Sequence, residues 1–273
     1  MTPLPTFTTL GAGPTVLMLH GVDGGSLAWA PQVESFASRG WRAVAWNMPG
    51  YGHSAPIEPY NFKGLAQSCL ALIDALACES VVLLGHDAGG MVAQEVALRW
   101  PQRVNRLVLC ATVAAFAGAD APTNGADRDP EHDGQCRFIA ERSAPLDAGQ
   151  SMEVLAQQLV PRRAGAAALR EGVDLAAHCL AQVSPATYRR ALEALAAFDR
   201  RADLARIRVP TLLVAGESDR DFPPAQMRAI ADRITDSRQV ELRGIGHWPH
   251  LEAPDEFDGL VLGFLADSQQ IAP

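Results

Sequence analysis

One aspartate stands where the sequence predicts a tight turn between a strand and a helix. Residues 85–90 read Gly-His-Asp-Ala-Gly-Gly, after the apolar run 80–84 and before the helix-like run 91–100. Such a turn holds its central side chain, here Asp87, above the end of a sheet. A carboxylate with a pKa of about 4 is ionised at pH 7, so Asp87 can attack carbon without the help of a base.

Two later loops carry an acid and a histidine. Gly216-Glu-Ser-Asp219 follows one strand-like run, and Gly244-Ile-Gly-His247 follows the last one. Functional loops of open α/β sheets lie at the carboxyl ends of the strands. We therefore expect Asp87, Asp219 and His247 to meet at one edge of the sheet.

A glycine-rich loop follows the first long strand. It reads His-Gly-Val-Asp-Gly-Gly over residues 20–25. Its glycines allow the backbone to approach a ligand, and we expect the Val22 and Ala88 N–H groups to form a pair of oxyanion donors. Asp23 follows Val22 directly, so it either contacts the substrate or forms an ordinary Asp-Gly turn.

Composition narrows the classes of partner. The 273 residues suffice for one large α/β domain, or for one core with an insertion. The formal charge of −8 opposes an extended nucleic-acid or anionic-membrane surface, so we expect a small-molecule substrate, no nucleic acid and no membrane partner. A homodimer is left open.

The cysteines and the N-terminus indicate the compartment. Five cysteines without CxxC spacing predict neither a disulfide framework nor a zinc site. The first residues lack a basic region followed by a long apolar run, and no segment reaches about 18 uninterrupted apolar residues. We expect a soluble cytoplasmic protein that needs no metal or organic cofactor.

Strand-like and helix-like segments alternate along most of the chain. This pattern is typical of an α/β fold with a mostly parallel sheet flanked by helices. Strands are predicted at 15–20, 42–46, 80–84, 106–110, 211–214 and 239–242, and helices at 27–38, 62–77, 91–100, 224–234 and 255–266.

The alternation stops between residues 114 and 205. This stretch opens with a run rich in Gly, Ala, Pro and Asp, and it continues as helical patterns without a convincing strand. We interpret it as an all-helical cap over the active site. The predicted division is a first core part over 1–113, the cap over 114–205 and a second core part over 206–273.

The motifs together resemble those of α/β-hydrolase-fold proteins. The resemblance runs from about residue 10 to the end, through His20-Gly21 and the segments 49–54 (PGYGHS), 85–90 (GHDAGG), 216–219 (GESD) and 246–254 (GHWPHLEAP). The frame and cap resemble 3-oxoadipate enol-lactonase-like hydrolases, which have serine at the central position of the tight strand-to-helix turn. An aspartate there is typical of haloalkane and fluoroacetate dehalogenases and epoxide hydrolases. The resemblance implies a catalytic triad with Asp87 as nucleophile, His247 as base and Asp219 as the acid that orients it.

The chemistry of a carboxylate favours a particular class of bond. Attack of Asp87 on an ester would give an anhydride, which is more reactive than the substrate. Attack on an sp3 carbon that bears a halide or an epoxide oxygen gives an ordinary ester, which water activated by His247 can hydrolyse. Ionised Asp87 should also raise the pKa of His247, and alkylation removes that charge.

The groups that assist the leaving atom differ from those of the resembled families. Ala88 stands where haloalkane dehalogenases carry tryptophan and fluoroacetate dehalogenases carry arginine. Epoxide hydrolases use two cap tyrosines, whereas Tyr188 is the only tyrosine between residues 114 and 205. Candidate substrate-binding residues are therefore Tyr188, Arg137 and Asp23, with Trp248 as wall or clamp, and Arg137 or Arg142 as a carboxylate partner.

The sequence thus predicts a hydrolase that forms a covalent ester on Asp87. The favoured substrate is an epoxide or an organohalide, with a substrate carboxylate left open. One alternative is a cofactor-free lactonase, carbon–carbon hydrolase or oxygenase that uses His247 and Asp219 for proton transfer. A second alternative is a ligand-binding protein without catalysis.

Overall fold

A computed structural model describes residues 3–116 and 130–267 of the chain. Within these residues a sheet of seven strands has the order β1-β3-β2-β4-β5-β6-β7, and only β1 runs antiparallel to its neighbour. The strands are β1 (Phe7–Leu10), β2 (Thr15–Leu19), β3 (Arg42–Trp46), β4 (Val81–His86), β5 (Val104–Cys110), β6 (Thr211–Gly216) and β7 (Ser237–Leu242). This mostly parallel sheet is the fold class that the sequence predicts.

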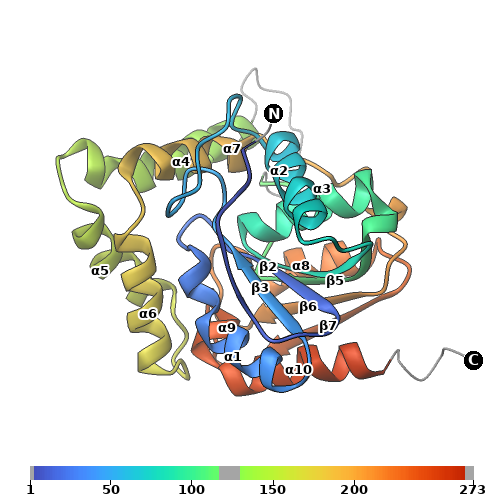
Figure 1. The fold of residues 1–273 in the computed structure, drawn as a ribbon. Coiled ribbons are helices and arrows are strands. Elements are labelled where there is room, and N and C mark those ends of the chain that lie inside the picture. The colour runs from blue at the N-terminus through green and yellow to red at the C-terminus, as the bar shows by residue number, and fades with distance from the viewer. Residues whose placement is uncertain (1–2, 117–129, 268–273) are drawn as a thin grey trace, which may run out of the picture.

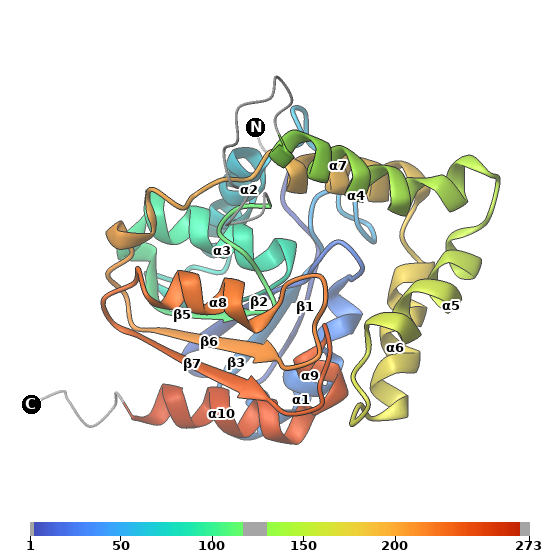
Figure 2. The same cartoon turned by 180° about the vertical axis from the view of Figure 1, so that it is seen from behind.

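Helices cover both faces of the sheet (Figures 1 and 2). The helices α1 (Ala30–Ser38) and α10 (Pro254–Ala266) pack on one face. The other face is covered by α2 (Phe62–Ala75), α3 (Ala88–Arg99) and α8 (Pro224–Ala231). Because both faces are covered, β2, β4 and β6 are buried along their whole length and read as continuous apolar runs.

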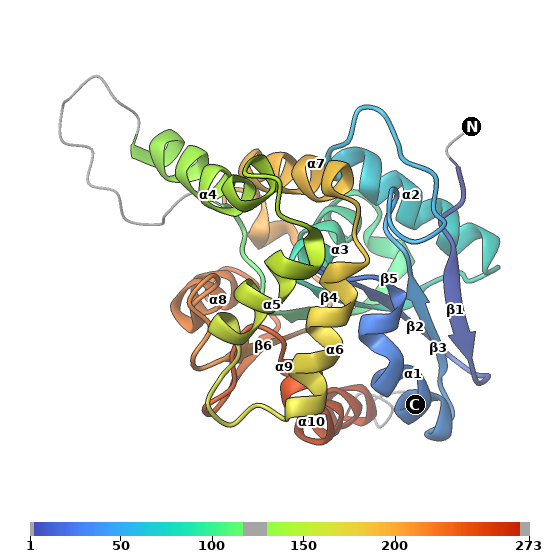
Figure 3. The ribbon, with the colours of Figure 1, turned by 90° about the vertical axis from the view of Figure 1, so that its left-hand side faces the viewer.

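Among the described residues between β5 and β6, four α-helices follow one another. They are α4 (Pro130–Asp147), α5 (Met152–Arg163), α6 (Arg170–Ala181) and α7 (Pro185–Ala196). Figure 3 shows α5 and α6 side by side, with α4 and α7 together above them. An antiparallel bridge between Ala115 and Asp199 joins the two ends of this segment. The described part of 114–205 is helical as expected, and the boundaries of a separate cap domain stay a prediction.

Several element boundaries differ from the sequence prediction. The expected helix 27–38 is a short 3-10 turn over Ser26–Trp29 followed by α1. The helix that starts at Phe62 ends at Ala75 because Ala77 adopts a positive φ of 55°. The strand β1 was not predicted, since its four residues are exposed and carry no buried face.

No helix in the part of the chain that the structure describes has both the length and the apolar character needed to span a membrane.

Candidate active site

Asp87 lies at a sharp turn between β4 and α3. Its backbone has φ 51° and ψ −121°, a conformation that is uncommon for residues other than glycine. The Thr112 hydroxyl donates a hydrogen bond to the Asp87 carbonyl oxygen at 2.7 Å, and the Asp87 N–H donates to the Cys110 carbonyl at 3.1 Å. These bonds to residues at the end of β5 hold the turn in place, as the sequence predicts for this motif.

One predicted oxyanion donor already holds the Asp87 carboxylate. The Val22 N–H donates to Asp87 Oδ2 at 2.9 Å. Gly21 permits this approach, because a Cβ atom at that position would overlap the Asp87 carboxylate. Ala88, which contains the second predicted donor, is the first residue of α3, and the structure shows no bond from its N–H to that carboxylate.

His247 and Asp219 form the expected pair. The His247 Nδ1–H donates to Asp219 Oδ2 at 2.9 Å, and both side chains are buried. The other oxygen, Asp219 Oδ1, accepts the N–H groups of Asp221 at 2.9 Å and of Phe222 at 3.1 Å, which fixes the carboxylate. The structure therefore brings Asp219, and not its neighbour Asp221, to the histidine. His247 Nε2 is buried without a hydrogen-bond partner.

The charges of this site perturb each other. Burial and the charge of Asp23 raise the pKa of Asp87 to about 6, against the opposing effects of His247, Arg163 and the Val22 N–H. Burial and Arg163 disfavour the protonated form of His247. The carboxylates of Asp219 and Asp87 outweigh them, so the pKa of His247 is raised.

Two buried arginines from α4 and α5 face aspartates of the core. Arg163, the last residue of α5, forms ion pairs with Asp23 and with Asp221. Arg142 of α4 binds Asp221 at 2.6 Å. Burial raises the pKa of Asp221, but the two guanidinium groups outweigh that effect and hold it well below the usual range. These ion pairs attach α4 and α5 to loops on either side of Asp87.

Aromatic side chains complete the surroundings of Asp87. Tyr188 of α7 is fully buried, its hydroxyl lies near the guanidinium of Arg142, and no acceptor binds the hydroxyl proton. The guanidinium of Arg163 lies 4.7 Å from the ring centre of Trp248, which therefore forms part of the wall. The Tyr51 hydroxyl donates to the Val22 carbonyl at 3.0 Å, so this tyrosine supports the loop that binds the Asp87 carboxylate.

The structure brings together most, but not all, of the residues expected around the substrate. Asp23, Tyr188 and Trp248 belong to the cluster, whereas Arg137 is exposed on α4. Sequence reasoning missed Arg163, which joins the cluster through its ion pairs with Asp23 and Asp221. Of the 23 basic residues only Lys63 is a lysine, so one more arginine at a helix end gave no distinguishing signal.

The other buried histidines support the structure. His20 donates from Nδ1 to the Gly21 carbonyl at 2.7 Å and accepts the Met48 N–H at 2.9 Å. Burial lowers the pKa of His20 to about 4, so the ring stays neutral and fixes the loop. Burial also lowers the pKa of His250, to about 3. No group of three His, Cys, Asp or Glu side chains among the described residues is placed to hold a metal ion.

The centre is closed to solvent in this structure. Asp87 is 1% exposed and His247 is 0% exposed. A cavity of about 300 Å³ lies between the loop 24–27, Tyr51 and the junction of α6 and α7 at residues 182–184. Tyr51 lines this cavity and also donates to the Val22 carbonyl, so the cavity lies next to the loop that holds the Asp87 carboxylate.

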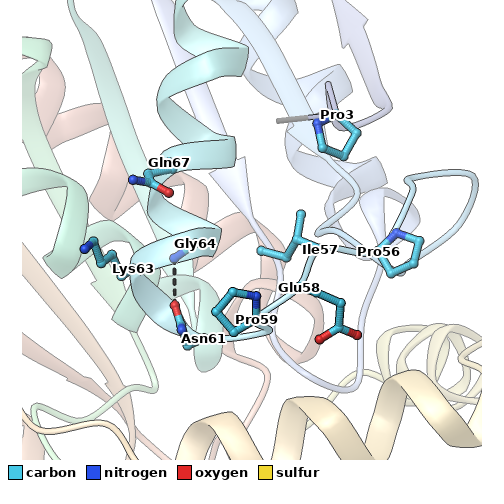
Figure 4. A pocket seen from close by; sticks show the side chains of 9 residues that line it. All are labelled: Pro3, Pro56, Ile57, Glu58, Pro59, Asn61, Lys63, Gly64 and Gln67. Carbon is cyan, nitrogen blue, oxygen red and sulfur yellow. Dashed lines mark hydrogen bonds between the residues drawn. The ribbon is translucent and has the colours of Figure 1, made fainter. Parts of the chain in front are cut away.

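A larger cavity of about 590 Å³ lies elsewhere. Figure 4 shows it against the loop 56–59 and the start of α2, where Asn61 accepts the Gly64 N–H. Its lining includes Glu58 and Lys63, and it contains none of the residues that surround Asp87. It therefore has no part in the chemistry considered below.

Comparison with known families agrees with this architecture. The family described as alpha/beta hydrolase fold matches residues 14–254. The chain belongs to this family. A protein named as carbamate hydrolase RutD from Azorhizobium caulinodans is 31% identical over 95% of this chain and 94% of its own length. The pimeloyl-[acyl-carrier protein] methyl ester esterase of Aeromonas hydrophila is 29% identical over 93% of this chain and 96% of its own length.

A solved structure supports the same assignment. The enol-lactonase from Burkholderia xenovorans LB400 has a TM-score of 0.81 and 27% sequence identity to this chain, and the match covers 96% of both chains. The resemblance to enol-lactonase-like proteins expected from the sequence is thereby confirmed. The chain is an α/β-hydrolase, and its substrate is a separate question.

Proposed function

We propose that this α/β-hydrolase forms a covalent ester on Asp87 with a small substrate and then hydrolyses it. The observation that carries the proposal is the 2.9 Å hydrogen bond from the Val22 N–H to Asp87 Oδ2. It fixes one oxygen of the carboxylate and leaves Oδ1 for attack. In the ester, Oδ2 becomes the carbonyl oxygen, and the same N–H then faces the negative charge that develops during hydrolysis.

The first step is a displacement at an sp3 carbon. Asp87 Oδ1 forms the new C–O bond while the bond to the leaving atom breaks, and the electron pair departs with a halide or an epoxide oxygen. The buried hydroxyl of Tyr188 is a candidate proton donor to an epoxide oxygen, because the neighbouring Arg142 can only donate to it and its own proton has no acceptor. No base is needed, since Asp87 is mostly ionised at pH 7 with a pKa of about 6.

The second step uses His247. Alkylation removes the Asp87 charge, which is one of the groups that raise the pKa of His247, so the histidine loses its proton more readily at this stage. Neutral His247 then takes a proton from water that attacks the Asp87 carbonyl carbon. The tetrahedral intermediate expels the product alkoxide, and His247 returns the proton to it. Asp87 is left as a carboxylic acid and loses its proton, to the Tyr188 phenolate after epoxide opening or to solvent after halide release, which restores the carboxylate.

A second candidate function rests on the relatives. They are named for a carbamate, a methyl ester and an enol-lactone, which favours the lactonase alternative over an epoxide or carbon–halide substrate. In that case Asp87, with its pKa of about 6, transfers protons together with His247 and Asp219. In this second candidate a substrate carbonyl oxygen would need the Val22 N–H as its hydrogen-bond donor. Asp87 Oδ2 already occupies that donor, so it would have to move away when the substrate binds.

One variant separates the two candidates. His247→Gln is expected to let an epoxide or haloalkane alkylate Asp87 and to stall hydrolysis, so mass spectrometry should find a stable adduct on the peptide that contains Asp87. The same variant is tested with lactones, carbamates and p-nitrophenyl esters. Turnover of a lactone or ester by the wild type, with no adduct from any electrophile on the variant, would overturn the covalent proposal in favour of proton transfer.

Labelled water provides an independent readout. In a single turnover in heavy-oxygen water, a nucleophilic Asp87 gives product that carries the old carboxylate oxygen, and the solvent label enters Asp87. Direct attack by water places the label in the product at once. Full labelling of the product in the first turnover therefore contradicts an Asp87 ester.

A further inference from the structure

Asp23 presents an unused hydrogen-bond acceptor beside the reacting carboxylate. It follows Val22, whose N–H binds Asp87 Oδ2. The Asp23 side chain is buried, its Oδ2 is paired with Arg163, and its Oδ1 has no hydrogen-bond partner. Neither step of the proposed reaction uses this oxygen, although a buried carboxylate oxygen gains strongly from a donor.

Two more polar atoms with unused hydrogen-bonding capacity lie around the same centre. They are the Tyr188 hydroxyl and His247 Nε2, both in fully buried side chains. The charge of Asp23 adds to burial in raising the pKa values of Asp87 and of Tyr188, as expected for groups that face one another. Buried polar atoms are normally satisfied, so these three atoms are placed to bind a polar substrate.

The charges around Asp87 oppose an anionic substrate. The guanidinium groups of Arg142 and Arg163 already face the carboxylates of Asp221 and Asp23. A substrate carboxylate would have to displace one of these aspartates and would then lie close to Asp87 as a like charge. The sequence left open a substrate carboxylate bound by Arg137 or Arg142, but Arg137 is exposed and Arg142 is paired.

We propose that Asp23 determines specificity by selecting uncharged substrates that carry a hydroxyl or N–H group next to the reacting carbon. Asp23 Oδ1 accepts the hydrogen bond from that donor, and the Tyr188 hydroxyl is the second polar partner. Substrates with a carboxylate at the same position are rejected. This inference rests on the proposed function only in placing the reacting carbon at Asp87.

A matched pair of epoxides tests the inference. Glycidol and glycidate differ in bearing a hydroxymethyl or a carboxylate group next to the epoxide. The wild type is expected to prefer glycidol by about tenfold or more in kcat/KM. Asp23→Asn removes the negative charge and one of the two ion pairs of Arg163, so this preference should narrow by about tenfold. The matched control is Asp203→Asn, which changes an exposed ion pair with Arg206 and should leave the ratio unchanged.

A second variant keeps the test independent of the ion pairs. Tyr188→Phe removes a hydroxyl whose proton has no acceptor and leaves the Arg142 and Arg163 ion pairs in place, so the fold should be retained while kcat/KM falls more for glycidol than for glycidate. An unchanged ratio in both Asp23→Asn and Tyr188→Phe would overturn the inference. Equal or better use of glycidate by the wild type would also overturn it.

A binding measurement separates this inference from the covalent mechanism. Glycerol and glycerate are unreactive, and their binding to the wild type can be followed by tryptophan fluorescence, since Trp248 lies under Arg163. Preferential binding of glycerol, lost in Asp23→Asn, would support the inference even if no Asp87 adduct ever formed. Adducts that form equally from both epoxides would retain the proposed function and overturn the role of Asp23.

Discussion

The Val22 N–H and the Asp87 carboxylate are joined by a hydrogen bond of 2.9 Å between loops that are 65 residues apart in the chain. The bond gives the two carboxylate oxygens different roles, since Oδ2 is held and Oδ1 is left for attack. It also places a backbone donor where charge develops when the ester is hydrolysed.

Gly21→Ala should disrupt this arrangement. The added Cβ would overlap the Asp87 carboxylate and displace it from the Val22 N–H, so we expect a loss of about a hundredfold in kcat. The control is Gly259→Ala in α10, where a Cβ meets no other atom and the helix gains about 0.5–1 kcal/mol. Steady-state kinetics and urea unfolding check both variants. Full activity of Gly21→Ala would contradict the described carboxylate position.

Asp87→Ser should create measurable activity on short p-nitrophenyl esters and simple lactones. Serine leaves the Val22 N–H free for a substrate carbonyl oxygen, and the pair of His247 and Asp219 at 2.9 Å can activate the hydroxyl. The variant should lose any dehalogenase or epoxide hydrolase activity. A folded variant without esterase activity above background would show that the backbone N–H donors, or the pair of His247 and Asp219, are misplaced for acyl transfer.

Asp87→Asn should stabilise the protein at neutral pH. Because the pKa of Asp87 is raised from 3.8 to about 6, ionisation of this buried group destabilises the fold as pH rises through that window. The neutral amide avoids this cost, so the variant should be more stable above pH 6 by up to about 3 kcal/mol, at about 1.4 kcal/mol per pKa unit. The gain should disappear below about pH 4. Urea unfolding at several pH values measures this gain in the free energy of unfolding. A difference between variant and wild type that stays constant across pH would contradict the raised pKa of Asp87.

Alkylation of Asp87 should depend on pH with the same pKa. Only the ionised carboxylate attacks, so the rate of adduct formation in the wild type should fall tenfold per unit below about pH 6. Protonated His247 lowers the pKa of Asp87, and His247→Gln removes that charge. The pH profile of this variant should therefore move to higher pH. Rapid quench with mass spectrometry measures both profiles, and a shift to lower pH would be inconsistent with this coupling.

Arg163→Met should be strongly destabilising. It leaves the buried Asp23 without its cation and the half-buried Asp221 with Arg142 alone, a kind of loss that costs about 3–5 kcal/mol. Arg206→Met, at an exposed ion pair with Asp203, is the control and should change stability by about 0–1 kcal/mol. Urea unfolding at pH 7 gives both values, and similar small losses would mean that the Arg163 pairs contribute little.

The sequence predicts the sheet and the catalytic loops because both follow local rules. Buried strands alternate with helices, and the carboxyl ends of parallel strands meet at one edge, which places Asp87, Asp219 and His247 together. The glycines of the loop 20–25 likewise predict that the Val22 N–H can approach the reacting group. These inferences need only the strand order and the direction of each strand.

Which arginine side chains face the core depends on tertiary packing, so it could not be predicted from the sequence. Arg137 and Arg142 lie on one helix, but five residues turn about 140° around its axis, so only one of them can face the core. Which one does so depends on how α4 packs against α7. Arg163 is similarly buried only because the end of α5 meets the loops of Asp23 and Asp221.

The ion pairs that attach α4 and α5 to the core also limit how the protein can be recombined. A chimera that received residues 130–196 from another protein would keep Asp23 and Asp221 in its core but would lose Arg142 and Arg163. The transplanted helices would have to bring cations to the same two places, or the aspartates would have to be replaced at the same time. The helical segment and the two loops beneath it are therefore a single unit of exchange.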